Sequence, residues 1–305
     1  MREYHSKDLT LLGKGGTGSV YRINDEQVLK TYSSSISPEE RMKKREAIKQ
    51  LLVKDVPAMV SFEVARIDDS YGIVYEMLKD STVAKSIMKD ASCLEEMGVK
   101  MGKLFRQMHN ADVSDCLPPF HERIMGWVDS AEETGFITKH CAKTMRTLIG
   151  IIPEGHALIH SDFHEGNVKV LKGELLLIDL DEIAYGNPLY DLAFHYNNHI
   201  AISKAADVCL KSVGMLPQYC KKIYEIELNA YFDGNIEAGL NKKLKPISLM
   251  LSALAVVRLN TDYLDNKLFL FIAKQMAVYF DIYTSCLLKL HPNIYGEKLN
   301  GQQKH

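Results

Sequence analysis

The hydrophobic pattern of the chain changes its period near residue 80, and this change constrains the fold more than any other feature. Before it, short apolar runs with β-branched and aromatic residues alternate with turn residues, which is typical of strands. We expect strands at Leu9–Leu12, Ser19–Ile23, Gln27–Tyr32, Val60–Ile67 and Gly72–Met77. One helix interrupts them: it begins at Ser37, has a proline and two acidic residues in its first turn, and runs to about Val53.

Beyond residue 80 the pattern is mainly helical. Between Ser92 and His109 apolar residues recur at spacings of three and four, which indicates one buried helix face. A short β region follows, with strands expected at Ala157–Ile159, Val168–Leu171 and Leu175–Leu180. From Asp191 to about Leu290 the chain again has the pattern of helices.

These patterns predict an α+β fold with two lobes. Residues 1–78 would form a small N-terminal sheet lobe with one helix. Residues 79–300 would form a larger, mainly helical C-terminal lobe, and residues 301–305 a tail.

The composition is that of a folded protein and argues against two kinds of partner. Hydrophobic residues make up 46% of the chain and charged residues 25%, so a large core can form. The net charge of −2 disfavours nucleic acid, whose binding needs a basic surface. The N-terminus is too polar for a signal peptide, and the later apolar stretches 247–257 and 268–288 are short or interrupted by charges. We therefore expect a cytoplasmic protein with no membrane and no nucleic-acid partner, whose six scattered cysteines are reduced.

A glycine-rich segment, Gly13-Lys14-Gly15-Gly16-Thr17-Gly18-Ser19-Val20-Tyr21, connects two of the expected strands. Glycines allow a tight turn and bring backbone N–H groups against phosphate oxygens. A dinucleotide fingerprint is disfavoured because a strand follows the glycines, and a P-loop because no Gly-Lys-Ser/Thr ends the motif. The segment predicts a phosphate-covering loop that uses Gly13, Gly15, Gly16, Gly18 and Val20, while an ordinary turn between strands stays open.

Lys30 lies at the end of the next expected strand, after Val28 and Leu29. A single lysine on an apolar strand commonly points to water. Its functional alternative is a contact with nucleotide phosphates, steadied by a glutamate from the neighbouring helix. Glu46 is the expected partner because it lies inside that helix, although it could equally pair with a lysine nearby on the same helix.

The most informative segment is His160-Ser161-Asp162-Phe163-His164-Glu165-Gly166-Asn167, directly after a short apolar strand. An aspartate five residues before an asparagine on such a loop places a carboxylate near a substrate hydroxyl and an amide oxygen near a metal. A solvated turn is the alternative.

A second group of polar residues, Asp179, Asp181 and Glu182, follows the apolar run from Leu175 to Ile178. Carboxylates this close repel one another unless a cation is present, so a Mg²⁺ site is expected here, with a solvated strand end as the alternative. The order of glycine loop, lysine, glutamate, His-x-Asp-x4-Asn and aspartate is what phosphoryl transfer from ATP requires.

With these motifs the chain resembles the aminoglycoside phosphotransferase and choline kinase branch of the protein-kinase-like superfamily. The resemblance runs from about Gly13 to Ala193 and is sharpest at His160-x-Asp162-x4-Asn167 and at Asp179 to Ala193. It implies the two-lobed protein-kinase-like fold, with ATP or GTP and Mg²⁺ as cofactors and a small-molecule hydroxyl as the acceptor.

The resemblance also implies roles for single residues. Asp162 would be the catalytic base, and His160 would order its loop. Asn167 and Asp179 would hold Mg²⁺, and Asp181 would assist the metal or the substrate. Asp191 would be a buried brace of the catalytic loop. The backbone of Glu76-Met77-Leu78 would receive the adenine, next to Tyr75.

Two departures from protein kinases favour a small-molecule acceptor. Ser161 stands where protein kinases usually carry arginine, and the distance from Asp179 to Asp191 leaves no room for an activation segment. The cluster Arg258, Asp262, Tyr263 and Asp265 could line the acceptor site or form a solvated helix end. Two other functions stay open: an atypical protein kinase, and a catalytically silent nucleotide-binding regulator.

Overall fold

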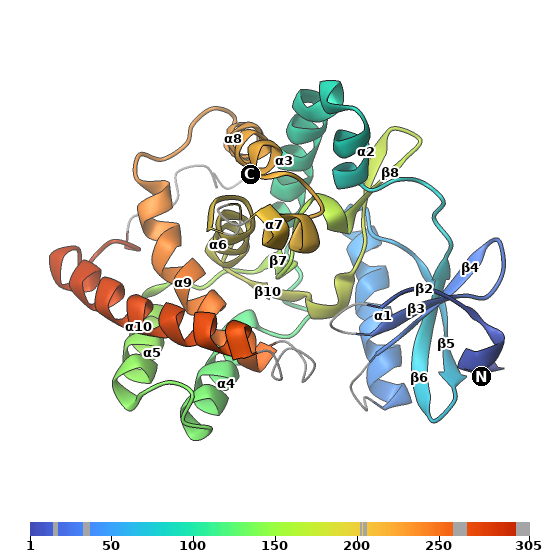
Figure 1. The fold of residues 1–305 in the computed structure, drawn as a ribbon, viewed down its shortest axis with the longest axis horizontal. Coiled ribbons are helices and arrows are strands. Elements are labelled where there is room, and N and C mark those ends of the chain that lie inside the picture. The colour runs from blue at the N-terminus through green and yellow to red at the C-terminus, as the bar shows by residue number, and fades with distance from the viewer. Residues whose placement is uncertain (15–17, 33–36, 202, 204–205, 259–266, 297–305) are drawn as a thin grey trace.

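The computed structural model describes residues 1–14, 18–32, 37–201, 203, 206–258 and 267–296. In these residues a curled sheet with one helix lies at one end of the molecule and a group of helices at the other (Figure 1). The predicted α+β fold with two lobes is therefore confirmed. The expected tail, 301–305, lies outside the described residues.

The N-terminal lobe contains one six-stranded sheet with the order β1-β5-β6-β4-β3-β2. Its strands are β1 (Glu3–Tyr4), β2 (Thr10–Lys14), β3 (Ser19–Arg22), β4 (Gln27–Thr31), β5 (Ser61–Ile67) and β6 (Ser70–Glu76). All neighbours are antiparallel except β1 and β5, which are parallel. The five predicted strands are present within two residues at each end, and the two-residue β1 is an addition too short to leave a pattern in the sequence.

Helix α1 (Pro38–Val53) confirms the predicted helix, and its N-terminus shows why it begins there. The side chain of Ser37 accepts a hydrogen bond from the backbone N–H of Glu40, whose carboxylate accepts one from the N–H of Ser37 in return. The helix contacts β5 and β6. Its buried residues Ile48 and Leu51 belong to the same hydrophobic core as the C-terminal helices, so the core continues from one lobe into the other.

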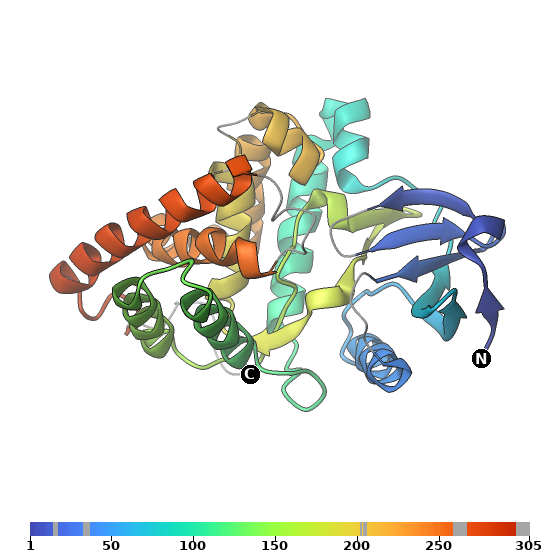
Figure 2. The ribbon, with the colours of Figure 1, turned by 60° about the horizontal axis from the view of Figure 1, so that its bottom comes forward.

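The C-terminal lobe is built mainly of helices, as Figure 2 shows from a second direction. They are α2 (Val83–Lys89), α3 (Leu94–Asn110), α4 (Phe120–Glu133), α5 (Lys139–Ile151), α6 (Leu189–Tyr196), α7 (Ala206–Ser212), α8 (Pro217–Tyr231), α9 (Leu240–Arg258) and α10 (Lys267–Leu290). Helix α3 packs on α8, and α9 packs on both α6 and α10. The apolar face predicted between Ser92 and His109 is the buried face of α3, because Met101, Phe105 and Met108 are fully buried.

Short strands lie between the helices and carry the polar motifs. Strand β7 (Ala157–Ile159) pairs with β10 (Ala184–Gly186), and β8 (Val168–Leu171) pairs with β9 (Glu174–Leu177). The predicted strand Leu175–Leu180 was wrong at its end, because Asp179 has a left-handed backbone (φ 59°) and residues 180–182 form a helical turn. A left-handed residue cannot continue a β ladder, so the strand stops before the acidic residues.

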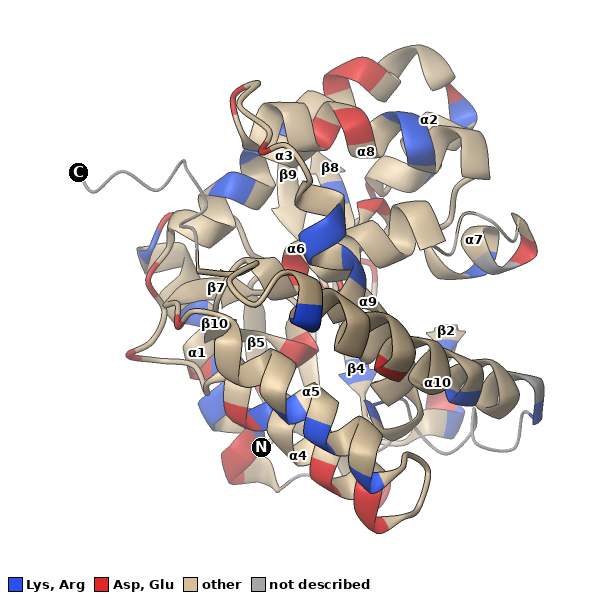
Figure 3. Ribbon diagram, turned by 90° about the vertical axis from the view of Figure 1, so that its left-hand side faces the viewer, with Lys and Arg blue, Asp and Glu red and all other residues tan. Residues whose placement is uncertain are grey.

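Charged residues of both signs are interspersed over the helical lobe (Figure 3). Among the residues that the structure describes, no helix combines the length and the apolar character that crossing a bilayer requires.

Candidate active site

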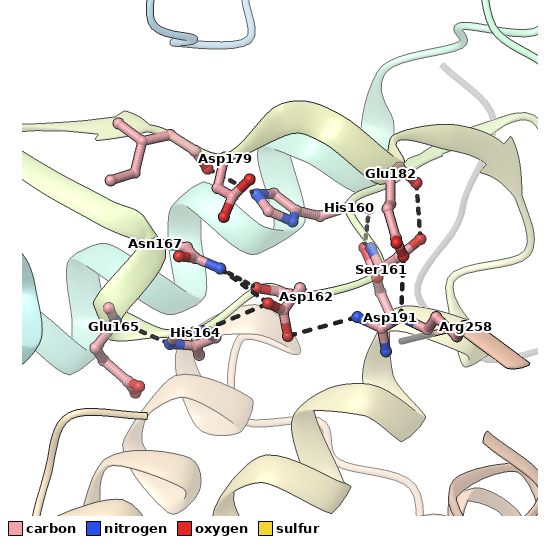
Figure 4. A network of polar contacts seen from close by, with 12 residues as sticks. His160, Ser161, Asp162, His164, Glu165, Asn167, Asp179, Glu182, Asp191 and Arg258 are labelled. Carbon is pink, nitrogen blue, oxygen red and sulfur yellow. Dashed lines mark hydrogen bonds and ion pairs between the residues drawn. The ribbon is translucent and has the colours of Figure 1, made fainter. Parts of the chain in front are cut away.

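The loop after β7 is held in place by Asp191 at the start of α6. Its fully buried carboxylate accepts hydrogen bonds from the backbone N–H groups of His160 at 2.6 Å and Ser161 at 2.7 Å (Figure 4). Ser161 has a left-handed backbone (φ 70°), which is unfavourable for a residue with a side chain. Asp191 therefore stabilises a strained loop conformation, and the prediction that it braces this loop is confirmed.

Asp162 lies on this loop with its carboxylate partly open to solvent, since 44% of the side chain is exposed. The side-chain amide of Asn167 donates to its carbonyl at 2.9 Å and to its carboxylate at 3.2 Å. His164 Nε2 is 3.7 Å from the same carboxylate. Burial alone would raise the pKa of Asp162, but His164, Arg258 and His160 together lower it well below its usual range. The carboxylate is thus ionised and accessible.

His160 is buried and connects the loop to the next motif. Its Nε2 lies 3.3 Å from the carbonyl oxygen of Ile178, the residue before Asp179. The backbone N–H of Ile178 also donates to the carbonyl of Asn167 at 3.0 Å. These contacts fix the position of Asp179 relative to the loop that carries Asp162 and Asn167.

Lys30 reaches from β4 across to the carboxylates of the C-terminal lobe. Its Nζ is 2.6 Å from Asp179 Oδ1 and also contacts the carboxylate of Asp181. Asp179 is 41% exposed, whereas only 8% of the Asp181 side chain is exposed. Burial would lower the pKa of Lys30, but the charges of Asp181 and Asp179 outweigh it and raise the pKa above its usual range. Lys30 is therefore an ammonium ion at the junction of the two lobes.

The predicted partnership between Lys30 and Glu46 was wrong. The carboxylate of Glu46 is 61% exposed and binds Lys49 at 3.1 Å, one of the pairings that the sequence had left open. Lys44 faces the site instead, with its Nζ 3.2 Å from Asp181 Oδ1 and bonded to the carbonyl of Asp181. Residues two apart on a helix do not share a face. The spacing of Arg41, Lys44, Ile48 and Leu51, which is three, four and three, was the signal that could have identified the inward face.

Two buried tyrosines, Tyr32 and Tyr75, lie next to these charged groups. Only Tyr75 was predicted from the sequence. Their hydroxyl groups, from Tyr32 and Tyr75, lie 3.4 Å apart in buried positions. The guanidinium of Arg41 lies 3.7 Å from the centre of the Tyr32 ring, and the ammonium groups of Lys30 and Lys44 lie within 6 Å of it. Burial and the charge of Asp181 raise the pKa of Tyr75 to about 12, so its hydroxyl stays protonated.

The glycine-rich segment lies beside Lys30 in the sheet. Val20 on β3 pairs with Lys30 on β4 and, on its other side, with Gly13 on β2. A Cβ atom on Gly18 would lie 1.9 Å from the carbonyl oxygen of Thr31, so only glycine fits there. Gly15 and Gly16 lie outside the described residues.

The segment between the lobes is tied to both of them. The N–H of Met77 donates to the carbonyl of Glu26 at 2.7 Å, directly after Glu76 at the end of β6. The carbonyl of Leu78 accepts from Lys169 Nζ at 3.2 Å. The expected adenine-binding backbone thus connects the sheet to β8.

On the far side of Asp162 lies Arg258, at the end of α9. Its Nε binds Glu182 at 2.9 Å, and its terminal nitrogen is 3.9 Å from Asp162 Oδ1 (Figure 4). Its guanidinium also lies over the ring of Phe194. In the sequence, Arg258 was grouped with Asp262, Tyr263 and Asp265, and these three lie outside the described residues. Glu182 was seen there only as part of the acidic group, because nothing in the sequence shows that α9 returns to this loop.

Comparison with known proteins identifies similar sequences and folds. Residues 8–208 match the sequence model of a family described as the phosphotransferase enzyme family. No curated protein sequence matches the chain.

Three solved structures illustrate the structural likeness. An amicoumacin kinase in complex with AMP-PNP and Ca²⁺ is 14% identical, with a TM-score of 0.60 over 92% of this chain and 90% of that one. A choline/ethanolamine kinase family protein from Mesorhizobium loti is 15% identical, with a TM-score of 0.55 over 92% and 88%. A thermostable aminoglycoside phosphotransferase mutant, crystallised with AMP-PNP and hygromycin B, is 15% identical, with a TM-score of 0.57 over 90% and 94%. At these identities the likeness concerns the fold.

Proposed function

This chain belongs to the phosphotransferase enzyme family, and from that premise we propose that it transfers the γ-phosphoryl group of ATP or GTP to a hydroxyl of a small molecule. The observation that carries the proposal is the convergence of Lys30, Asp179 and the loop of Asp162 and Asn167 at the junction of the lobes. The cytoplasm, where these nucleotides are abundant, is the expected location.

The nucleotide would bind between the lobes, where its phosphates would meet the glycine-rich segment and Lys30. In support, Gly18 lies tightly against the strand that carries Lys30, so the end of the glycine-rich segment is held beside that lysine. The adenine would reach the backbone of Glu76 and Leu78, next to Tyr75. The ammonium group of Lys30 contacts two carboxylates, and it could replace one of these contacts by hydrogen bonds to phosphate oxygens of a bound nucleotide.

The residues around Asp179 fit a Mg²⁺ ion. They offer the oxygen ligands that this hard cation prefers, namely the amide oxygen of Asn167 and the carboxylates of Asp179 and Asp181. Of the two carboxylates that Lys30 contacts, that of Asp179 is the more exposed, so it is accessible to a metal ion. When bound, Mg²⁺ neutralises charge on the phosphates during transfer.

Asp162 would orient the acceptor hydroxyl and accept its proton. Its lowered pKa makes it a weak base, which suits a loose transition state in which positioning matters more than proton abstraction. A small acceptor is favoured over a protein because β10 and α6 follow Asp179 at once, without a platform for a peptide.

The direct test replaces Asp162 by Asn and measures ADP formation with Mg²⁺, ATP and a library of hydroxyl-bearing metabolites. We expect turnover of the accepted metabolite to fall by roughly 10²–10⁴-fold while AMP-PNP binding, measured by calorimetry, is retained. Asp207→Asn, at an exposed position of α7, serves as the control and should keep full turnover. Undiminished turnover of Asp162→Asn would refute the base assignment, and a wild-type protein that binds no nucleotide would refute the function.

A further inference from the structure

Behind the catalytic loop lies a cluster of titratable side chains that the proposed reaction does not use. Glu165 belongs to that loop, and Figure 4 shows its carboxylate pointing away from Asp162. His195 lies on α6, His199 on the helical turn that follows it (Asn197–Ala201), and Glu227 on α8. All four side chains are completely buried.

The polar atoms of these side chains converge. His195 Nε2 is 2.8 Å from Glu227 Oε2, and His199 Nε2 is 2.9 Å and 3.0 Å from the two carboxylate oxygens of Glu165. Ligand atoms of His195, His199 and Glu227 all lie within 4.8 Å of one another. Atoms that bind one ion at about 2.0–2.2 Å lie roughly 3–4 Å apart, so these three side chains are spread slightly wider than a coordination sphere. Glu165 is outside this group of three and joins it through its contact with His199.

The polar atoms of this cluster are close together but poorly aligned for hydrogen bonds within the described part of the chain. His195 Nε2 contacts Glu227 Oε2, and the carboxyl group of Glu227 also lies near that of Glu165. Even so, neither ring nitrogen of His195 and neither carboxylate oxygen of Glu227 makes a well-aligned hydrogen bond there. His199 Nδ1 lies 2.9 Å from the carbonyl of His195, which can only accept, so this nitrogen carries the hydrogen. His199 Nε2 is then the ring nitrogen that faces the carboxylate of Glu165. Ligand histidines in metal sites are oriented by a bond of this type.

The charges of the cluster also need an explanation. The carboxyl groups of Glu165 and Glu227 lie within hydrogen-bonding reach of each other. Two carboxylates this close in a fully buried place require a proton or a cation between them. The rings of Phe105 and Tyr224, whose centres lie within 5.5 Å of the His195 ring centre, close the cluster on one side.

We propose that Glu165, His195, His199 and Glu227 bind a divalent transition-metal ion of the Zn²⁺ type. Two imidazoles and two carboxylates form a nitrogen and oxygen set that Zn²⁺ accepts, and the two carboxylate charges balance those of the ion. With four protein ligands and no exposed face, the site is structural. It fastens the catalytic loop to α6 and α8 and is separate from the proposed Mg²⁺ ligands, whose donors are all oxygens.

The test measures metal content rather than activity, so its outcome is independent of the proposed function. The full chain, without a polyhistidine tag, is produced in Zn²⁺-supplemented medium, dialysed and analysed by plasma mass spectrometry. We expect one equivalent of metal per wild-type chain and a loss of most of it in Glu227→Gln. Glu225→Gln, at an exposed position of the same helix, is the matched control and should retain it.

Loading with Co²⁺ gives a second readout that does not depend on the folding of a variant. We expect the wild-type chain to show the visible absorption bands of Co²⁺ bound by nitrogen and oxygen ligands, and Zn²⁺ to displace them. A wild-type chain that contains no metal and develops no such bands would overturn the proposal, and the cluster would then be two buried imidazole–carboxylate pairs. Retention of a full equivalent by Glu227→Gln would overturn the assigned ligand set.

Discussion

Lys44 and Glu46 are two residues apart on α1, yet one faces a buried carboxylate and the other faces solvent. Asp181 lies between the ammonium groups of Lys30 and Lys44, and these two charges lower its pKa well below its usual range although burial would raise it. A kinase-like site usually contains a glutamate on this helix. Here the described residues place a second lysine there, and Asp181 from the other lobe supplies the carboxylate.

Replacement of Lys44 by Met tests this arrangement. Asp181 would keep Lys30 but lose one of its two cations, so we expect the free energy of unfolding to fall by about 1–3 kcal/mol. Urea denaturation measures this loss. Lys49→Met removes a lysine from the exposed pair with Glu46 on the same helix and should cost under about 1 kcal/mol. Equal losses in the two variants would contradict the buried role of Lys44.

In the proposed reaction, Arg258 would limit which charges an acceptor can bring next to Asp162. Its guanidinium is 3.9 Å from the Asp162 carboxylate, so a cationic group beside the reacting hydroxyl would be repelled there. We expect Arg258→Gln to raise the KM of the accepted metabolite roughly tenfold, the effect of one lost charge-assisted hydrogen bond, with little change in the KM of ATP.

Steady-state kinetics with both substrates separate the two constants. Arg146→Gln, which removes an arginine paired with Asp129 and Glu132 between α5 and α4, is the control and should change neither. An unchanged acceptor KM in Arg258→Gln would show that Arg258 does not contact the acceptor.

At the scale of elements, the conformation of the loop that carries Asp162 depends on contacts with α6 rather than on local sequence preferences alone. The loop begins after a strand of three residues, contains the left-handed Ser161, and is held by the first turn of α6. Beside it, β9 ends before the left-handed Asp179, and the contacts of Ile178 with His160 and Asn167 join the two segments. The loop conformation therefore depends on α6 remaining docked.

Asp191→Asn tests that dependence. The amide that replaces the carboxylate accepts through one atom only, so one of the two backbone N–H groups would lose its partner in a buried place. We expect the free energy of unfolding to fall by about 2–4 kcal/mol and kcat to fall with it, measured by urea denaturation and ADP formation. Asp129→Asn, at an exposed ion pair, should change stability by under about 1 kcal/mol. Wild-type stability of Asp191→Asn would argue against the brace.

At the scale of the molecule, the main hydrophobic core extends from the C-terminal helices to α1, the sheet has smaller apolar clusters of its own, and the lobes also meet at polar contacts. Ile48 and Leu51 of α1 belong to the same core cluster as the C-terminal helices. The backbone of Leu177 at the end of β9 exchanges hydrogen bonds with Pro57 and Met59 before β5. Lys30 and Asp179 are 149 positions apart in the chain and form one ion pair. A nucleotide bound at this junction would therefore contact both lobes at once.

Thermal unfolding measures that linkage. At a concentration of Mg²⁺ and AMP-PNP about 100-fold above the dissociation constant, binding adds about 2.7 kcal/mol, which corresponds to a rise in Tm on the order of 4 °C for a chain of this size. Lys30→Met should reduce the shift, because it removes the ammonium group nearest the phosphates. A Tm that does not respond to the nucleotide would contradict binding at the junction.

The sequence by itself determined the two-lobed fold, most of the strands and the helix that begins at Ser37, and it pointed to the loop that carries the proposed catalytic residues. Hydrophobic periodicity and capping act over a few residues, so they are visible in the chain as it is read. The sequence could not determine that Lys44 rather than Glu46 faces Asp181, or that α9 brings Arg258 to Asp162. Nor did it indicate that Glu165, His195, His199 and Glu227 converge. These pairings join residues that are distant in the chain, and only the packing of helices against the sheet and against each other brings them together.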